Sequence, residues 1–165
     1  MIGAEIVTRA RSVIASNCIY ALGKGGFDPA SPFPWNSKGE CDCSGYVAWC
    51  LEVSRHTDHP WYKSQNGGWL ETSAIARDCK TPYGMFDAVP WEAARPGDLL
   101  VYRDSNGSQG HVGIVTSVLE DGPGAVIHCS KGSFTRSGDA IAETGPGIWK
   151  LHPGSLVARC CLVDD

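Results

Sequence analysis

Apolar positions follow two different periods along this chain, helical in the first half and strand-like in the second. Near the start, Ile2, Ile6 and Ala10 recur at four-residue intervals, as they do along one face of a helix. This spacing predicts a first helix from about residue 2 to residue 21, with Gly23 as its C-terminal stop.

Two further helices are predicted in the first half of the chain. One begins at Cys43 and ends at about Ser54, and a short one is expected from about Trp69 to Asp78. The segment 23–39, which precedes the second helix, contains three prolines and four glycines and is expected to be irregular. Its aromatic residues indicate an ordered lid or the wall of a cleft.

The second half of the chain has the pattern of an antiparallel sheet. The runs 99–102 and 111–118 flank a turn at 104–110 and predict a hairpin, and further strands are expected at 125–129 and 155–162. Helices followed by a meandering sheet predict an α+β fold with N-terminal helices packed on a central antiparallel β-sheet. The length of 165 residues predicts one domain, spanning 1–165.

Composition and charge exclude several classes of partner. The formal net charge is −4 and Lys and Arg are not clustered, so neither nucleic acid nor an anionic membrane is expected to bind. No apolar run approaches the roughly 20 residues that a membrane span needs. The N-terminus lacks the basic-then-apolar order of a signal peptide, so an exported chain would use another route or would already have been trimmed.

The tetrapeptide Asp42-Cys43-Ser44-Gly45 opens the second predicted helix. Asp42 is a favourable N-cap, and Cys43 would then lie at the positive end of the helix, where free N–H groups stabilise a thiolate. The sequence therefore predicts a nucleophilic thiol with a lowered pKa. The alternative is a buried, unreactive cysteine on a core helix, which is the more common role of a single cysteine.

A thiol nucleophile needs a base, and histidine titrates in the useful range. Two of the five histidines, His111 and His128, lie on successive predicted strands, which would place one as the base and the other as the residue that orients it. Either could instead be a hydrogen-bonded core histidine. The remaining three are expected to be solvated surface residues: His56, His59 and His152.

Five segments occur in the order found in a known family. They are Tyr20-Ala21-Leu22-Gly23, Asp42-Cys43-Ser44-Gly45-Tyr46-Val47, Arg95-Pro96-Gly97-Asp98-Leu99-Leu100-Val101-Tyr102, Gly110-His111-Val112-Gly113-Ile114-Val115 and Ile127-His128. Together they resemble the motifs of the NlpC-type cell-wall cysteine peptidases, a branch of the papain-like superfamily. The set covers most of the chain, and it is far more specific than an isolated Asp-Cys-Ser-Gly.

The resemblance implies a reaction and a site. The reaction would be hydrolysis of amide bonds in bacterial peptidoglycan stem peptides, commonly between D-glutamate and a diamino acid, through a thioester acyl-enzyme. No cofactor would be needed. The implied residues are Cys43 as nucleophile, His111 as base and acid, His128 as orienting residue, and Tyr20, Asp42 and Ser44 at the substrate end of the cleft.

The eight cysteines raise the question of metal binding or disulfides. The spacing of Cys41 and Cys43 is not that of a Cys-x-x-Cys site, and no matching second pair accompanies it, so no metal is predicted. A disulfide of Cys41, either shaping the 23–39 segment or joining Cys43, is a second hypothesis.

Three alternatives to the endopeptidase reading stay open: cleavage of the N-acetylmuramoyl-L-alanine amidase type, a papain-like acyltransferase, and an inactive cell-wall binding module. The expected place of action is the bacterial periplasm or cell wall. A free-standing catalytic domain fits three origins: a phage lytic or tail component, a fragment of a larger protein, or an effector of a secretion apparatus. An effector would have a delivery or immunity partner. The sequence does not predict the oligomeric state.

Overall fold

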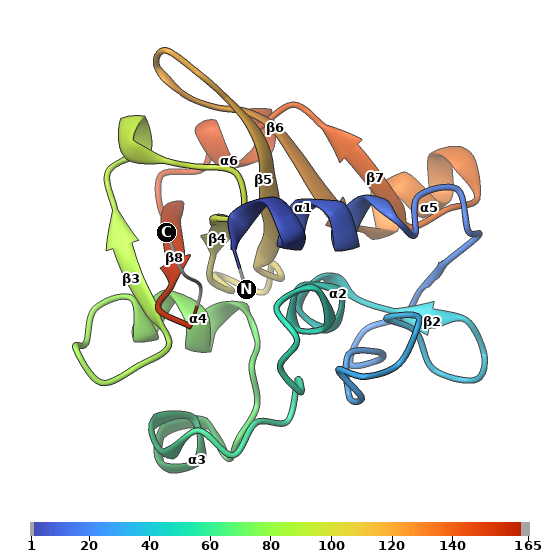
Figure 1. Cartoon of the computed structure of the whole chain (residues 1–165), viewed down its shortest axis with the longest axis horizontal. Coiled ribbons are helices and arrows are strands. Elements are labelled where there is room, and N and C mark those ends of the chain that lie inside the picture. The colour runs from blue at the N-terminus through green and yellow to red at the C-terminus, as the bar shows by residue number, and fades with distance from the viewer. Residues whose placement is uncertain (1, 163–165) are drawn as a thin grey trace.

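A six-stranded antiparallel sheet forms the centre of the computed structural model, which describes residues 2–162 (Figure 1). Its strands lie in the order β3-β8-β4-β5-β6-β7. A separate two-stranded parallel sheet joins β1 and β2. The strand bounds are β1 Ile19–Tyr20, β2 Glu40–Cys41, β3 Phe86–Val89, β4 Leu99–Tyr102, β5 His111–Leu119, β6 Gly122–Cys129, β7 Ile141–Thr144 and β8 Leu156–Cys160.

Helices cover both faces of the central sheet. Alternate strand residues point to opposite faces, so Leu99 and Val101 pack with α1, α2 and α4, whereas Leu100 packs with Trp149 of α6. The bounds are α1 Gly3–Arg11, α2 Cys43–Cys50, α3 Pro60–Asn66, α4 Thr72–Asp78, α5 Lys131–Ser137 and α6 Gly147–Lys150, with a 3-10 turn at Trp91–Ala93. The predicted α+β class with an antiparallel sheet is confirmed.

Helix α2 is the most enclosed element of the fold. All of its residues are buried, because α1, the sheet and the irregular segment 23–39 surround it. Gly26, at φ +72°, lies so close to Gly45 that a Cβ atom on Gly26 would collide with the Gly45 backbone. The indole N–H of Trp49 donates to the carbonyl of Ser31 at 2.8 Å. The segment is therefore an ordered wall against the start and the flank of α2.

Two predicted helices are shorter than expected. The first ends at Arg11, not at residue 21, because the chain turns through Ala15 and Asn17, both at φ near +60°, before it enters β1. The second ends at Cys50, not at residue 54, and Glu52 at φ +56° follows it. In both cases left-handed residues other than glycine end the helix, and the apolar spacing alone did not reveal them.

The predicted strands of the second half are confirmed within a few residues, but other elements were missed. The strand predicted at 125–129 begins earlier, at Gly122. The helix predicted at 69–78 begins at Thr72, where the Glu71 carboxylate accepts from the first backbone N–H groups. The sequence reading did not predict α3, β3, α5, β7 or α6. No described helix combines the length and the apolar character needed to cross a bilayer.

Candidate active site

Asp42 fixes the start of α2. Its Oδ1 accepts the backbone N–H of Gly45 at 2.9 Å, which is the predicted N-cap bond, and the hydroxyl of Ser44 at 3.3 Å. Its Oδ2 accepts the backbone N–H of Gly23 at 2.6 Å and the Arg55 guanidinium at 2.8 Å. The carboxylate thus accepts four hydrogen bonds, about its full capacity.

Arg55 is a site residue that the sequence reading missed. It is buried, and besides Asp42 it donates to the Ser44 hydroxyl at 2.9 Å and to the carbonyl of Lys24 at 2.7 Å. A single arginine after a helix is no sequence signal for a residue that binds the N-cap carboxylate. Its signal would have been the buried Asp42, since a carboxylate removed from water requires a cation or several donors.

Cys43 lies at the first position of α2, beside the strand that carries His111. The hydrogen-bonded ladder between β5 and β6 runs from Ile114 with Ile127 to Leu119 with Gly122, so the first residues of β5 lie beyond it. There the backbone N–H of Val112, together with that of Ser44, favours the thiolate of Cys43. The structure therefore brings the thiol to the end of β5.

The pKa of Cys43 is raised, not lowered. Burial is the largest cause and the Asp42 carboxylate the next, and together they bring the pKa to about 12 despite the N–H groups and Arg55. The sequence-based expectation of a lowered pKa was wrong, because it counted the helix N-terminus and left out desolvation and the capping anion. In the free protein the thiol is protonated at neutral pH.

His111 and His128 lie side by side, as the two predicted strands required. Nε2 of His111 is 2.8 Å from Nδ1 of His128, and both rings pack against Trp149. Gly113 makes room for this pair, because a Cβ atom there would lie 2.7 Å from Val126 and 3.0 Å from the Cβ of His128. The packing of His128 and Val126 therefore explains why position 113 is a glycine.

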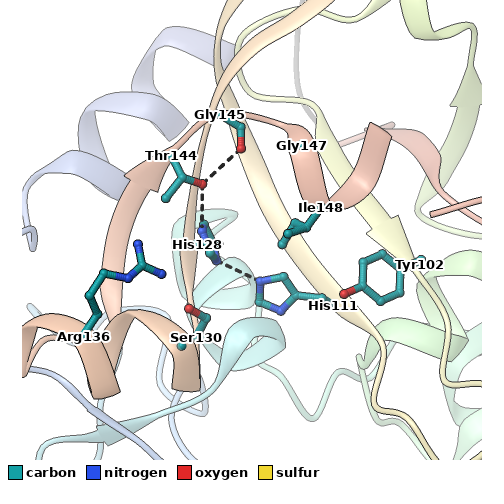
Figure 2. A pocket seen from close by; sticks show the side chains of 10 residues that line it. Tyr102, His111, His128, Ser130, Arg136, Thr144, Gly145, Gly147 and Ile148 are labelled. Atoms are coloured by element: carbon teal, nitrogen blue, oxygen red, sulfur yellow. Dashed lines mark hydrogen bonds between the residues drawn. The ribbon is translucent and has the colours of Figure 1, made fainter. Parts of the chain in front are cut away.

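A chain of hydrogen bonds sets the position of the protons on both rings (Figure 2). The Thr144 hydroxyl donates to the carbonyl of Gly145 at 3.2 Å, so it accepts from Nε2 of His128 at 3.1 Å. Nδ1 of His128 is then an acceptor for Nε2–H of His111. The lone pair of His111 is left on Nδ1, which is the atom free to take up a proton.

Both imidazoles are neutral at physiological pH. Burial, followed by repulsion from His128, lowers the pKa of His111 to about 3. Burial, followed by repulsion from Arg136, lowers the pKa of His128 to about 4. A protonated thiol and a neutral imidazole, rather than an ion pair, therefore form the resting state, and the imidazole can act as a base when the thiol reacts.

The three residues predicted at the substrate end gather around Cys43. They line a cavity of about 180 Å³ together with residues that the sequence reading missed. Proximity to the Cys43 charge, after burial, raises the pKa of Tyr20. The lining consists of Tyr20, Leu22, Gly23, Asp42, Cys43, Ser44, Arg55, Glu71, Thr72, Asp104, Gln109 and Gly110.

The two histidines line a second and larger cavity, of about 580 Å³ (Figure 2). The linings of the two cavities include adjacent residues of the chain, since Gly110 lines the first and His111 the second. The second cavity is lined by Tyr102, His111, His128, Ser130, Gly132, Arg136, Thr144, Gly145, Gly147 and Ile148. Burial, followed by proximity to the Cys43 charge, raises the pKa of Tyr102.

The remaining histidines lie outside this arrangement. His56 is exposed and approaches the carbonyl of Gly67, and His59 is partly buried against Tyr62. His152 was expected to be solvated, but its ring stacks on Tyr102 with centroids 4.1 Å apart. It is therefore a packing partner of the cavity wall.

All eight cysteines are free thiols. Because Cys41 and Cys43 are both free, the hypothesis of a disulfide between them has no support in this structure. Cys41 is buried, and its carbonyl accepts from the thiol of Cys129 at 3.5 Å. Among residues 2–162, no group of three or more potential ligands is arranged to hold a metal ion.

Comparisons with known proteins agree with this α+β fold. Among solved structures, NlpC1 from Trichomonas vaginalis superposes with a TM-score of 0.55 at 18% identity, over 96% of this chain and 43% of that one. The chain thus spans less than half the length of that protein, and the likeness concerns the fold. A comparison with curated proteins gave no significant match.

The family follows from the sequence match. Residues 33–132 match the CHAP domain model, so the chain belongs to the CHAP domain family. Members of this family are typically amidases or peptidases that act on peptidoglycan. The predicted assignment to the NlpC-type, papain-like cysteine peptidases is confirmed by the two matches together. The matched segment contains Cys43, His111 and His128, whose roles stay predictions.

Proposed function

We propose that this protein hydrolyses amide bonds in peptidoglycan stem peptides, between D-glutamate and the diamino acid, through a thioester on Cys43. The observation that carries the proposal is the hydrogen-bonded series His111, His128 and Thr144, which leaves Nδ1 of His111 as a base on β5, the strand whose Val112 N–H interacts with the thiol. A buried structural cysteine would need no such base.

The reaction begins with both groups neutral. His111 Nδ1 takes the proton of Cys43 as the sulfur attacks the carbonyl carbon, and the imidazolium that forms is stabilised by His128, the acceptor of its Nε2–H. The oxyanion would accept from the backbone N–H of Cys43 at the start of α2. His111 then gives the proton to the leaving amine.

Hydrolysis of the thioester repeats the same steps with water. His111 removes a proton from the attacking water, and the second tetrahedral intermediate collapses to a free carboxylate and the Cys43 thiol. Because the pKa of Cys43 is raised, the departing sulfur is a strong base, and His111 returns to it the proton that was taken from water. The acyl part of the substrate would occupy the cavity lined by Tyr20, Asp42 and Ser44.

The test uses intact peptidoglycan and defined stem peptides, with new termini identified by mass spectrometry. Wild-type protein should release peptides that begin with the diamino acid, and Cys43→Ala should release none. Cys161→Ala is the matched control, because this thiol is exposed and lies outside both cavities, so its loss should not change the rate.

Other outcomes would replace the proposal. A new N-terminus on L-alanine would identify an amidase that cuts next to the sugar, and transfer of the acyl group to an added amine would identify an acyltransferase. Binding without cleavage by the wild type would leave a wall-binding module. Retained cleavage by Cys43→Ala would overturn the assignment of the nucleophile. With a substrate of this kind, the protein would act in the bacterial periplasm or cell wall. A delivery or immunity partner would have to be sought by a separate experiment.

A further inference from the structure

The cavity that the histidines line is larger than the one around Cys43, and the mechanism gives it no occupant so far. We infer that it is the subsite for the leaving amine, and that Arg136 binds a carboxylate carried by this leaving group. The inference rests on the proposed function and names the residue that would select the departing part of the substrate.

The direction of the substrate follows from proton transfer. The base that receives the thiol proton must return it to the nitrogen of the leaving amine, so this amine lies on the imidazole side of the scissile bond. His111 and His128 line the larger cavity, whereas Cys43 lines the smaller one. The acyl part therefore extends into the smaller cavity and the leaving part into the larger.

The two cavities differ in charge. Three carboxylates and one arginine line the cavity around Cys43. Among the described residues that line the larger cavity, Arg136 alone carries a formal charge at neutral pH, because both imidazoles are neutral. An anionic group on the leaving part would be attracted to this cavity by the guanidinium of Arg136.

Arg136 is available for such a group. It lies in the last turn of α5, and within residues 2–162 no carboxylate forms an ion pair with it. Figure 2 shows its guanidinium extending from α5 toward the strand that carries Thr144. Arg136 and His128 line the same cavity, and after burial the charge of Arg136 contributes to the lowered pKa of His128. A guanidinium matches a carboxylate with two parallel hydrogen bonds.

Two glycines of the cavity lining could carry a larger side chain. Gly145 and Gly147 line the cavity, and a Cβ atom on either would meet no atom within 4 Å. Neither has the positive φ that only glycine tolerates, so larger side chains fit the backbone there. A larger side chain at either position would therefore add bulk at the lining of the cavity without displacing packed atoms.

The first test compares substrates that differ only in charge. L-alanyl-γ-D-glutamyl-L-lysine and L-alanyl-γ-D-glutamyl-L-lysyl-D-alanine are each prepared with a free C-terminal carboxylate and as the C-terminal amide. Wild type should have kcat/KM about tenfold higher for at least one carboxylate form, as expected for a charge-assisted hydrogen bond. Arg136→Gln should bring this ratio close to one by slowing only the carboxylate form.

The ratio separates binding from effects on the base. Arg136 also influences His128, but that influence is the same for both forms of a substrate and cancels in the ratio. Lys131→Gln is the matched control, since it removes a charge from the same helix outside the cavity and should keep the wild-type ratio. An unchanged ratio in Arg136→Gln, or an equal loss for both forms, would overturn the inference.

Filling the cavity gives a steric test. Gly147→Leu should lower kcat/KM for the peptide substrates at least tenfold and leave hydrolysis of the γ-methyl ester of L-alanyl-D-glutamate nearly unchanged, because methanol needs no room. Equal rates of wild type and Gly147→Leu on the peptides, with the variant shown to be folded by its thermal unfolding, would contradict a leaving-group subsite here.

Binding distinguishes failure of the inference from failure of the proposed function. In calorimetry with Cys43→Ala, L-lysyl-D-alanine should bind at least tenfold tighter than its amide, and the additional change Arg136→Gln should abolish the difference. If this result holds and the wild type cleaves no stem peptide, the proposed function alone is overturned. Equal binding of the two ligands would overturn the inference whatever the enzyme cleaves.

Discussion

Nε2 of His111 lies 2.8 Å from Nδ1 of His128, and this contact determines which nitrogen of His111 is left for the nucleophile. His128 in turn donates to Thr144, so the tautomer of His111 depends on a hydroxyl that is two hydrogen bonds away from it.

Removing His128 should slow the reaction without weakening substrate binding. His128→Ala leaves the Nε2–H of His111 without an acceptor, so kcat should fall roughly 10²-fold at nearly constant KM. His128→Asn or His128→Gln retains an acceptor and should recover part of the loss. Steady-state kinetics of the three variants measure this, and a large rise in KM alone would point to a binding role instead.

Thr144→Val tests whether the Thr144 hydroxyl determines the tautomers of His128 and His111. The valine has nearly the same shape but accepts no hydrogen bond from Nε2–H of His128, so kcat should fall roughly five- to tenfold. Thr144→Ser keeps the hydroxyl and should restore the rate. Nitrogen chemical shifts of the two imidazoles report the tautomers, and unchanged shifts in Thr144→Val would show that the hydroxyl does not set them.

The pH dependence of kcat/KM should be broad. The active form has a protonated Cys43, with a pKa of about 12, and an unprotonated His111, with a pKa of about 3. As pH falls toward the pKa of His111 the base is lost, and as pH rises toward that of Cys43 the thiol ionises, so kcat/KM should change little between about pH 5 and pH 9. A fall centred near pH 7 would indicate an ion pair instead.

Stability should decrease as pH falls below neutrality. In the unfolded chain an imidazole titrates near 6.5, whereas His111 and His128 titrate near 3 and 4 in the folded protein. Between these values the unfolded state binds more protons, so stability is complete above about pH 6.5 and is lost progressively as pH falls toward 4. Urea unfolding at several pH values measures the slope, which should be smaller in His128→Asn.

The buried pair of Asp42 and Arg55 should be sensitive to the loss of one partner. Arg55→Met leaves an uncompensated buried carboxylate, and the free energy of unfolding should fall by about 3–5 kcal/mol. The exposed pair of Lys63 and Asp58 is the control, and Lys63→Ala should have no measurable effect on stability. Asp42→Asn combined with Arg55→Met should recover part of the loss, and a purely additive result would argue against coupling.

The strands and the histidine pair were predictable because the information is local. Alternating apolar positions around His111 and His128 define two strands, and a short turn between them places the rings on one face. The start of α2 was predictable for the same reason, since Asp42 and Gly45 are three residues apart.

What the sequence did not reveal depends on contacts between distant residues. The raised pKa of Cys43 comes from burial by several elements, and Arg55 and Thr144 reach the site from parts of the chain with no recognisable motif. The end of the first helix at Arg11 likewise depends on Ala15 and Asn17 in left-handed conformations, which side-chain patterns indicate poorly.

The carboxylate of Asp42 joins three parts of the chain, through Gly23, Gly45 and Arg55. A helix opening with Asp-Cys-Ser-Gly would therefore not carry its geometry into another scaffold, because two of the groups that hold the capping residue would stay behind. The continuous segment 23–55 contains both of these groups together with the 23–39 segment that packs against α2. Engineering of the nucleophile in this protein should treat these 33 positions as one part.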